Sequence, residues 1–178
     1  IEIKFRADKA SLDALAKSVP LKGGTLSPAR ELSSVYYDTA ERDLQRHGIA
    51  FRIRRKAKAT PVMSMKRGGV MSAAVFSREE VEVPCPDGTP DLDLFDPATR
   101  ERLAAAAGGK PLEPVFEARV RRRLGVLRHG TTEIELALDQ GVISAGEARL
   151  RLCEIELELK SGDLRDLLDC ATALARDF

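Results

Sequence analysis

The sequence is poor in aromatic residues and in cysteine, and it has no long apolar run. Aromatic residues make up 4% of the 178 positions and tryptophan is absent, so few rings are present to stack on a nucleobase. Three widely separated cysteines, Cys85, Cys153 and Cys170, argue against a disulfide framework and predict a reducing, cytoplasmic environment. No apolar segment approaches the ~20 residues that span a bilayer, and Ile1 opens directly into a strand pattern rather than a signal peptide. We therefore predict no membrane partner.

Charge is abundant but balanced. Charged residues make up 32% of the chain, yet the formal net charge is only +1. A global field of this size cannot attract a polyanion, so any anion selectivity must come from local arrangement, and no specific nucleic-acid partner is predicted. The length and a hydrophobic content of 43% suit a single domain over residues 1–178.

Short segments in which charged and aliphatic residues alternate recur along the chain. The clearest runs from Glu154 to Lys160, and period-two alternation is typical of β-strands. Helices are predicted from Asp8 to about Val19, from Asp96 to Gly108 and from Asp163 to Arg176, and Asp8 and Asp96 are suitable N-caps. About eight strands, mostly joined as hairpins, with helices at the ends and in the middle predict an α+β fold. Because a long antiparallel sheet tends to close, we expect a closed eight-stranded antiparallel β-barrel with flanking helices.

The two faces of these strands differ in chemistry. One face is aliphatic and is expected to lie against the helices, whereas the other is charged and is expected to line the barrel. Arg122 has the parity of the aliphatic face, so it is predicted to be solvent-exposed at a strand end. A lumen with rows of glutamates and arginines must stay wet, and it would suit a polyanion with metal ions.

Several ordered motifs resemble the CYTH superfamily, also called the triphosphate tunnel metalloenzymes, over essentially the whole chain. They are Ile1-Glu2-Ile3-Lys4-Phe5, Tyr37-Asp38-Thr39, His47-Gly48-Ile49-Ala50-Phe51-Arg52-Ile53-Arg54, Met65-Lys66, Arg78-Glu79-Glu80, Leu138-Asp139-Gln140-Gly141 and the acidic segment Glu154–Lys160. Two departures stand out: the first glutamate of the N-terminal signature would precede Ile1, and Phe51 replaces an aliphatic residue.

The resemblance implies a tunnel that binds a triphosphate and hydrolyses its terminal phosphate with Mg²⁺ or Mn²⁺. Guanidinium and ammonium groups suit phosphate binding, and the residues expected in this role are Lys4, Arg52, Arg54, Lys66, Arg78, Arg119, Arg121 and Arg123. Carboxylates suit Mg²⁺, and the expected ligands are Glu2, Glu156 and Glu158, followed by Glu80, Glu135, Asp139 and Glu154. The residues expected to take part in catalysis are Lys4, Arg52, Arg54, Lys66, Arg78 and Glu80.

The scarcity of aromatic residues favours inorganic triphosphate over a substrate with an organic group. The composition also resembles the N-terminal domain of bacterial inorganic triphosphatases in which a CHAD domain follows, so a CHAD domain beyond Phe178 is an expected partner. Two alternatives remain open. One is a module that binds polyphosphate without turnover, and the other is an enzyme acting on nucleotides or thiamine triphosphate, such as a class IV adenylyl cyclase.

Overall fold

A computed structural model describes residues 1–21, 24–68, 75–76 and 79–177. The strands are β1 (Glu2–Arg6), β2 (Thr25–Leu26), β3 (Arg30–Asp38), β4 (Ile49–Lys56), β5 (Val62–Arg67), β6 (Val75–Phe76), β7 (Glu79–Pro84), β8 (Glu113–His129), β9 (Thr132–Ala145) and β10 (Ala148–Ser161). The helices are α1 (Lys9–Leu21), α2 (Asp43–Arg46), α3 (Pro97–Ala107) and α4 (Leu164–Asp177), with one 3₁₀ turn, η1 (Leu92–Leu94).

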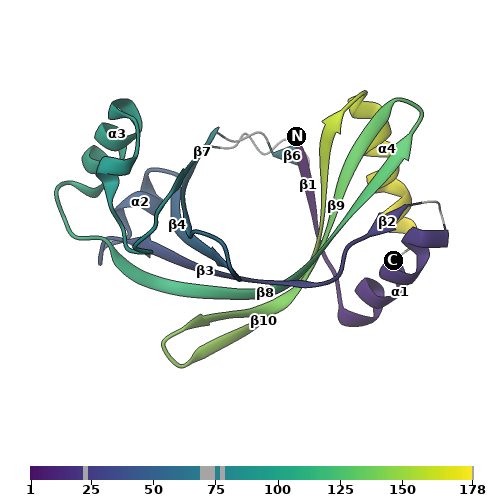
Figure 1. The fold of residues 1–178 in the computed structure, drawn as a ribbon, viewed down its shortest axis with the longest axis horizontal. Coiled ribbons are helices and arrows are strands. Elements are labelled where there is room, and N and C mark those ends of the chain that lie inside the picture. The colour runs from purple at the N-terminus through teal and green to yellow at the C-terminus, as the bar shows by residue number, and fades with distance from the viewer. Residues whose placement is uncertain (22–23, 69–74, 77–78, 178) are drawn as a thin grey trace.

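All the strands belong to one antiparallel sheet, which curves into an open half-barrel (Figure 1). The order is β6-β1-β10-β9-β8-β3-β4-β5-β7, and β2 pairs with β8. The predicted antiparallel α+β architecture is confirmed. The predicted closed, eight-stranded form differs, because the sheet has 10 strands and its two ends, β6 and β7, do not pair within the described residues. β6 and β7 are consecutive in the sequence but lie at opposite edges of the sheet, because β6 pairs with β1 and β7 pairs with β5.

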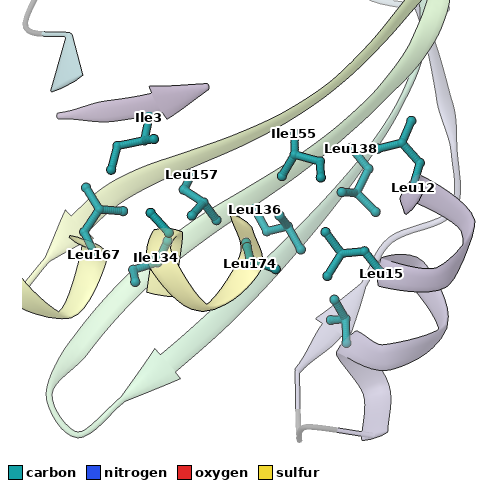
Figure 2. Close-up of a cluster of buried hydrophobic side chains, with 12 residues drawn as sticks. Ile3, Leu12, Leu15, Ile134, Leu136, Leu138, Ile155, Leu157, Leu167 and Leu174 are labelled. Carbon is teal, nitrogen blue, oxygen red and sulfur yellow. The ribbon is translucent and has the colours of Figure 1, made fainter. Parts of the chain in front are cut away.

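Two hydrophobic cores cover the outer, convex face of the sheet. Under α1 and α4, side chains such as Ile3, Leu136 and Leu157 point from β1, β9 and β10 toward the helices (Figure 2). On the other wall, Phe51 and Met65 of β4 and β5 form a second core with residues of α3. Period-two strands have one face on these cores, so the expected aliphatic face is confirmed, and the charged residues that alternate with the core residues face the hollow of the half-barrel.

Side-chain caps fix where α1 and α3 begin. The Asp8 carboxylate accepts a hydrogen bond from the Ser11 backbone N–H at 2.7 Å, and Asp96 accepts from Thr99 N–H at 3.0 Å. Each cap satisfies a backbone donor that has no partner within the helix. Both predicted N-caps are therefore confirmed. Gly108 ends α3 with a φ of 61°, a conformation that glycine adopts without a steric penalty.

The Tyr-Asp-Thr motif has a structural role in this chain. The buried Asp38 carboxylate accepts hydrogen bonds from the backbone N–H groups of Thr39, Leu44 and Gln45. These contacts fasten the short helix α2 to the end of β3. The carboxylate of Asp43 is held in turn by Thr39 and Lys110, and hydrogen bonds from Thr39 and Lys110 lower the pKa of Asp43 to about 2.

Gly141 lies where β8 and β9 approach each other too closely for a side chain. A Cβ atom at this position would stand 2.1 Å from the Arg119 carbonyl oxygen and 2.8 Å from the Val120 Cα atom. Both are backbone atoms, so the strand itself would have to move. We expect Gly141→Ala to lower the free energy of unfolding by about 1–3 kcal/mol or more, measured by urea denaturation. Gly146→Ala is the control for removing a glycine, since a Cβ atom there meets nothing within 4 Å, although its positive φ adds a smaller strain. Equal stability losses in the two variants would contradict the close approach at Gly141.

Within the described residues, no helix combines the length and apolar character needed to cross a membrane.

Candidate functional site

The concave face of the half-barrel gathers charged side chains from both walls. Residues opposite each other in an antiparallel sheet point to the same face. On one wall Lys4 of β1 opposes Glu156 of β10, and Glu2 opposes Glu158. On the other wall Arg52 of β4 opposes Ser64 of β5, which opposes Glu82 of β7. The alternation of each strand thus directs acids and bases into one hollow.

Glu156 is a well-enclosed carboxylate of this hollow, with 12% of its side chain accessible, and two cations hold it. Lys4 Nζ lies 2.5 Å from Glu156 Oε1 and 2.9 Å from Glu2 Oε1, and Arg122 Nη2 lies 2.8 Å from Glu156 Oε2. Burial alone would raise the pKa of Glu156, but Arg122 and Lys4 outweigh it and hold that pKa below its usual value. Burial likewise acts to lower the pKa of Lys4, and Glu156 and Glu2 reverse this, so the pKa is raised. The opposite charges thus favour the ionised forms of both Lys4 and Glu156.

Arg122 is the main correction to the sequence prediction. It is not solvent-exposed: only 19% of its side chain is accessible, and its guanidinium makes a two-pronged contact with Asp139, at 2.7 Å from Nε and 2.5 Å from Nη2. Burial would lower the pKa of Arg122, but hydrogen bonds and charge from Asp139 and Glu156 raise it. Arg122 thus lies in the hollow as a permanent cation between two carboxylates.

The expected placement of Arg119, Arg121 and Arg123 in the lumen is also wrong. These residues alternate with Arg122 along β8, so their side chains lie on the opposite face of the sheet. Arg121 opposes Gln140, which opposes Cys153, and Cys153 packs against the core under α1 and α4. The three odd-numbered arginines therefore point to the outer face. The run Arg119–Arg123 has basic residues at both parities, so its own pattern could not decide the face. The pairing of Arg122 with Asp139 in the register of β8 and β9 decides it.

The opposite wall presents cations that are only partly neutralised. Arg52 is 8% exposed, and its guanidinium reaches Ser64 Oγ at 3.0 Å and Glu80 Oε1 at 3.5 Å. Lys66 Nζ lies 3.0 Å from Glu80 Oε2. Glu80 is thus shared by Arg52 and Lys66, and it stands beside the cations that the sequence assigned to phosphate binding.

Arg54 forms no close ion pair with a carboxylate among the residues that the structure describes, although the charge of Glu82 attracts it. Its Nε donates to the buried Ser34 Oγ at 3.1 Å. Burial lowers the pKa of Arg54, and the nearby charges of Arg52 and Arg122 lower it further. A guanidinium held away from water among other cations is stabilised by an anion placed next to it. Ser34 was not expected at the site. It lies two residues from Tyr36 on β3, so the two side chains share a face, and Ser34 is directly opposite Arg54.

The remaining predicted residues occupy the rim of the hollow or lie outside the described part. Glu154 opposes Asp139 and Arg6, and burial, with the charges of Glu156 and Asp139, raises its pKa despite Lys4. Glu158 lies 3.2 Å from Lys160 Nζ and opposes Glu135. Arg78 falls outside the described residues.

The residues of the acidic wall fit a divalent cation by their donor chemistry. Within the described part of the chain, no three carboxylate, histidine or cysteine groups are already clustered as a metal centre. The Lys4 ammonium nevertheless lies between the carboxylates of Glu2 and Glu156, so a cation position already exists there. Glu158 is next to it on the same face. Carboxylate oxygens with retained waters are what Mg²⁺ prefers.

Comparison with known proteins gives a family match over nearly the whole chain. A CYTH domain model matches residues 1–177. An inorganic triphosphatase from Haemophilus influenzae is 31% identical over 145 residues, which is 80% of this chain and 40% of that protein. The chain thus spans less than half the length of this relative.

Solved structures share the fold at lower identity. HpAC1 of Hippeastrum, named as an adenylyl cyclase candidate with a dominant triphosphatase activity, superposes with a TM-score of 0.65 at 19% identity, covering 99% of this chain and 86% of that one. An adenylate cyclase candidate from Bacillus halodurans gives a TM-score of 0.61 at 17% identity, covering 99% and 86%. These likenesses show a common architecture.

Proposed function

The chain belongs to the CYTH domain family, and we propose that it hydrolyses inorganic triphosphate to pyrophosphate and phosphate in its charged hollow. The observation that carries the proposal is Arg54, a half-buried guanidinium without a close ion pair in the described residues, on the wall opposite β1 and β10 (Figure 1). The Haemophilus influenzae relative, an inorganic triphosphatase, supports this substrate. A CHAD domain in the complete protein remains a prediction.

The basic wall is suited to hold the phosphate chain. Arg52, Arg54 and Lys66 lie on two adjacent strands, and Arg122 approaches from β8. Planar guanidinium groups bind phosphate oxygens in pairs, and an ammonium acts as a point charge. Together these groups would neutralise the substrate and the charge that moves onto the leaving oxygen as pyrophosphate departs.

The acidic wall is suited to a metal ion. Glu2, Glu156 and Glu158 would hold Mg²⁺ or Mn²⁺, and the ion when bound would supply charge neutralisation and polarisation of phosphate oxygens. Because the Lys4 ammonium contacts Glu2 and Glu156, Lys4 would turn toward the substrate phosphates as these carboxylates accept a divalent charge.

Hydrolysis requires a proton acceptor and an in-line path. A water oxygen attacks the terminal phosphorus, the bond from that phosphorus to the bridging oxygen breaks, and pyrophosphate leaves with the electron pair. Glu80 stands next to Arg52 and Lys66, so we assign it the proton that the water loses. That proton passes to the phosphate product.

A second candidate function has one observation in its favour. Tyr36 and Phe116 are stacked at 4.3 Å on the concave face, and the Tyr36 hydroxyl is 3.4 Å from Arg52. These rings offer a surface for an organic group, which a nucleotide or thiamine triphosphate carries and inorganic triphosphate lacks.

Turnover of four substrates distinguishes these functions. We expect phosphate release from inorganic triphosphate with Mg²⁺ or Mn²⁺ to exceed that from ATP, thiamine triphosphate and long-chain polyphosphate by about tenfold or more in kcat/KM, because the contacts are almost all to phosphate. Chelation with EDTA should abolish it. Pyrophosphate release from ATP, or a preference for thiamine triphosphate, would support the second candidate. Tight binding of polyphosphate with no turnover of any substrate would instead indicate a binding module.

A further inference from the structure

A strip of the outer sheet face carries arginines and lies between the two helix-covered cores, beside the first residue of α1. The core under α1 and α4 covers one end of the convex face, and the core that includes α3 covers the other. Between them, Arg55 of β4, Arg119 and Arg121 of β8 and Arg151 of β10 line one groove with a volume of about 1230 Å³. We call these four residues the outer arginine cluster.

The register fixes the geometry of this cluster. Arg55 and Arg119 both oppose Ser33, and Arg119 and Arg151 both oppose Val142. Neighbouring strands lie about 4.8 Å apart, so each of these arginine pairs is separated by about 10 Å across the sheet. Arg121 follows Arg119 by two residues, which is about 7 Å along β8. All four point away from the hollow that contains Arg54 and Arg122.

The groove is strongly cationic and under-neutralised. Six cationic and two anionic side chains line it. Arg119 pairs with Glu117 at 2.8 Å, and Arg55 donates to the Gly88 carbonyl at 2.6 Å. Arg121 opposes Glu31 of β3, but neither Arg121 nor Arg151 makes a side-chain ion pair or hydrogen bond within the described part of the chain. Like charges held together on one sheet face repel each other, so an anion placed among them would be bound favourably.

We propose that the outer arginine cluster is a docking site for an extended acidic segment of a partner protein. Alternate side chains of an extended peptide are about 7 Å apart on one face, so acidic residues at every second position match Arg119 and Arg121. Val142, between Arg119 and Arg151, is 37% exposed and can contact the aliphatic CH₂ groups of the acidic side chains that face the sheet. A bare phosphate chain would leave Val142 uncovered. The described residues that line the groove include no aromatic side chain, so they offer a nucleic acid no ring on which to stack its bases.

Binding of designed peptides tests the site. The probe is a fluorescent peptide of alternating glutamate and valine, titrated against the chain and followed by fluorescence anisotropy, with an alternating lysine–valine peptide as the charge-reversed probe. We expect the acidic peptide to bind at least about tenfold more tightly than the basic one, and to weaken as ionic strength rises to about 0.15 M. The double variant Arg121→Glu/Arg151→Glu should weaken the acidic peptide by about tenfold or more.

A matched control separates the site from overall charge. Arg165→Glu/Arg176→Glu makes the same change in net charge on α4, where both side chains are exposed, and it should leave peptide affinity within about twofold. Thermal unfolding checks that both double variants are folded. Equal weakening by the two double variants, equal affinity for both peptides, or no detectable binding would overturn the proposal. Inorganic polyphosphate is the last competitor to test. If it displaces the acidic peptide, binds more tightly than the peptide, and loses affinity in the Arg121→Glu/Arg151→Glu variant, the proposal is overturned in favour of a phosphate ligand.

Discussion

We expect Glu156→Gln to lower kcat for triphosphate hydrolysis by about 10²–10³-fold. Glu156 has both carboxylate oxygens in contact with cations, Lys4 on one side and Arg122 on the other, and it is a proposed metal ligand. Glutamine keeps the shape but removes the negative charge, so the acidic wall loses the group that its cations surround. The measurement is steady-state phosphate release across a series of Mg²⁺ or Mn²⁺ concentrations.

The metal series distinguishes a ligand from a structural residue. A lost ligand raises the metal concentration needed for half-maximal rate, and high metal partly restores activity, whereas a purely structural defect lowers the rate at every concentration. Glu133→Gln is the control, because Glu133 pairs with the exposed Arg128 at 3.0 Å at the end of β9. Full activity in Glu156→Gln, with an unchanged metal requirement, would remove Glu156 from the proposed site.

Strict alternation explains how much of the fold and site the sequence predicted. In Glu154–Lys160 every second residue is aliphatic, so a one-residue slip would bury charge, and the predicted faces of Glu156 and Leu157 agree with the structure. The same pattern placed Ile3, Arg52 and Lys66 on their observed faces. Local capping chemistry was equally readable at Asp8 and Asp96, because a cap depends only on neighbouring residues.

The rest depended on contacts between distant segments. Arginines at 121, 122 and 123 are adjacent in sequence, so only pairing with β9 could show that Arg122 meets Asp139 while its neighbours face outward. Closure of the sheet depends on whether the edge strands β6 and β7 pair with each other. Instead, β6 pairs with β1 and β7 pairs with β5. Neither result follows from periodicity, which specifies a face but not a neighbour.

Arg54→Met should abolish most triphosphatase activity without loss of stability. Arg54 is half-buried, the charges of Arg52 and Arg122 outweigh the attraction of Glu82, and among the described residues its side chain donates to the Ser34 hydroxyl. Methionine removes a repelled charge and retains most of the aliphatic stem, so we expect an unchanged or higher melting temperature. Losing a guanidinium that we propose binds the phosphate chain should cost about 10²–10³-fold in kcat/KM. Thermal unfolding and phosphate release measure the two effects.

Ligand-induced stabilisation then shows whether Arg54 acts through the substrate. A ligand that binds only the folded state raises the melting temperature, so triphosphate should stabilise the wild-type chain and stabilise Arg54→Met much less. Arg54→Lys separates charge from shape: it restores the cation but not the planar fork, and we expect partial recovery of binding with little recovery of kcat. Arg100→Met is the control, since Arg100 lies on α3 and contacts the exposed Asp93 at 3.3 Å. An Arg54→Met variant that loses stability in parallel with activity would mean that Arg54 supports the fold. A stable, inactive variant whose melting temperature triphosphate no longer raises would mean that Arg54 serves to bind the anion and does not stabilise the fold.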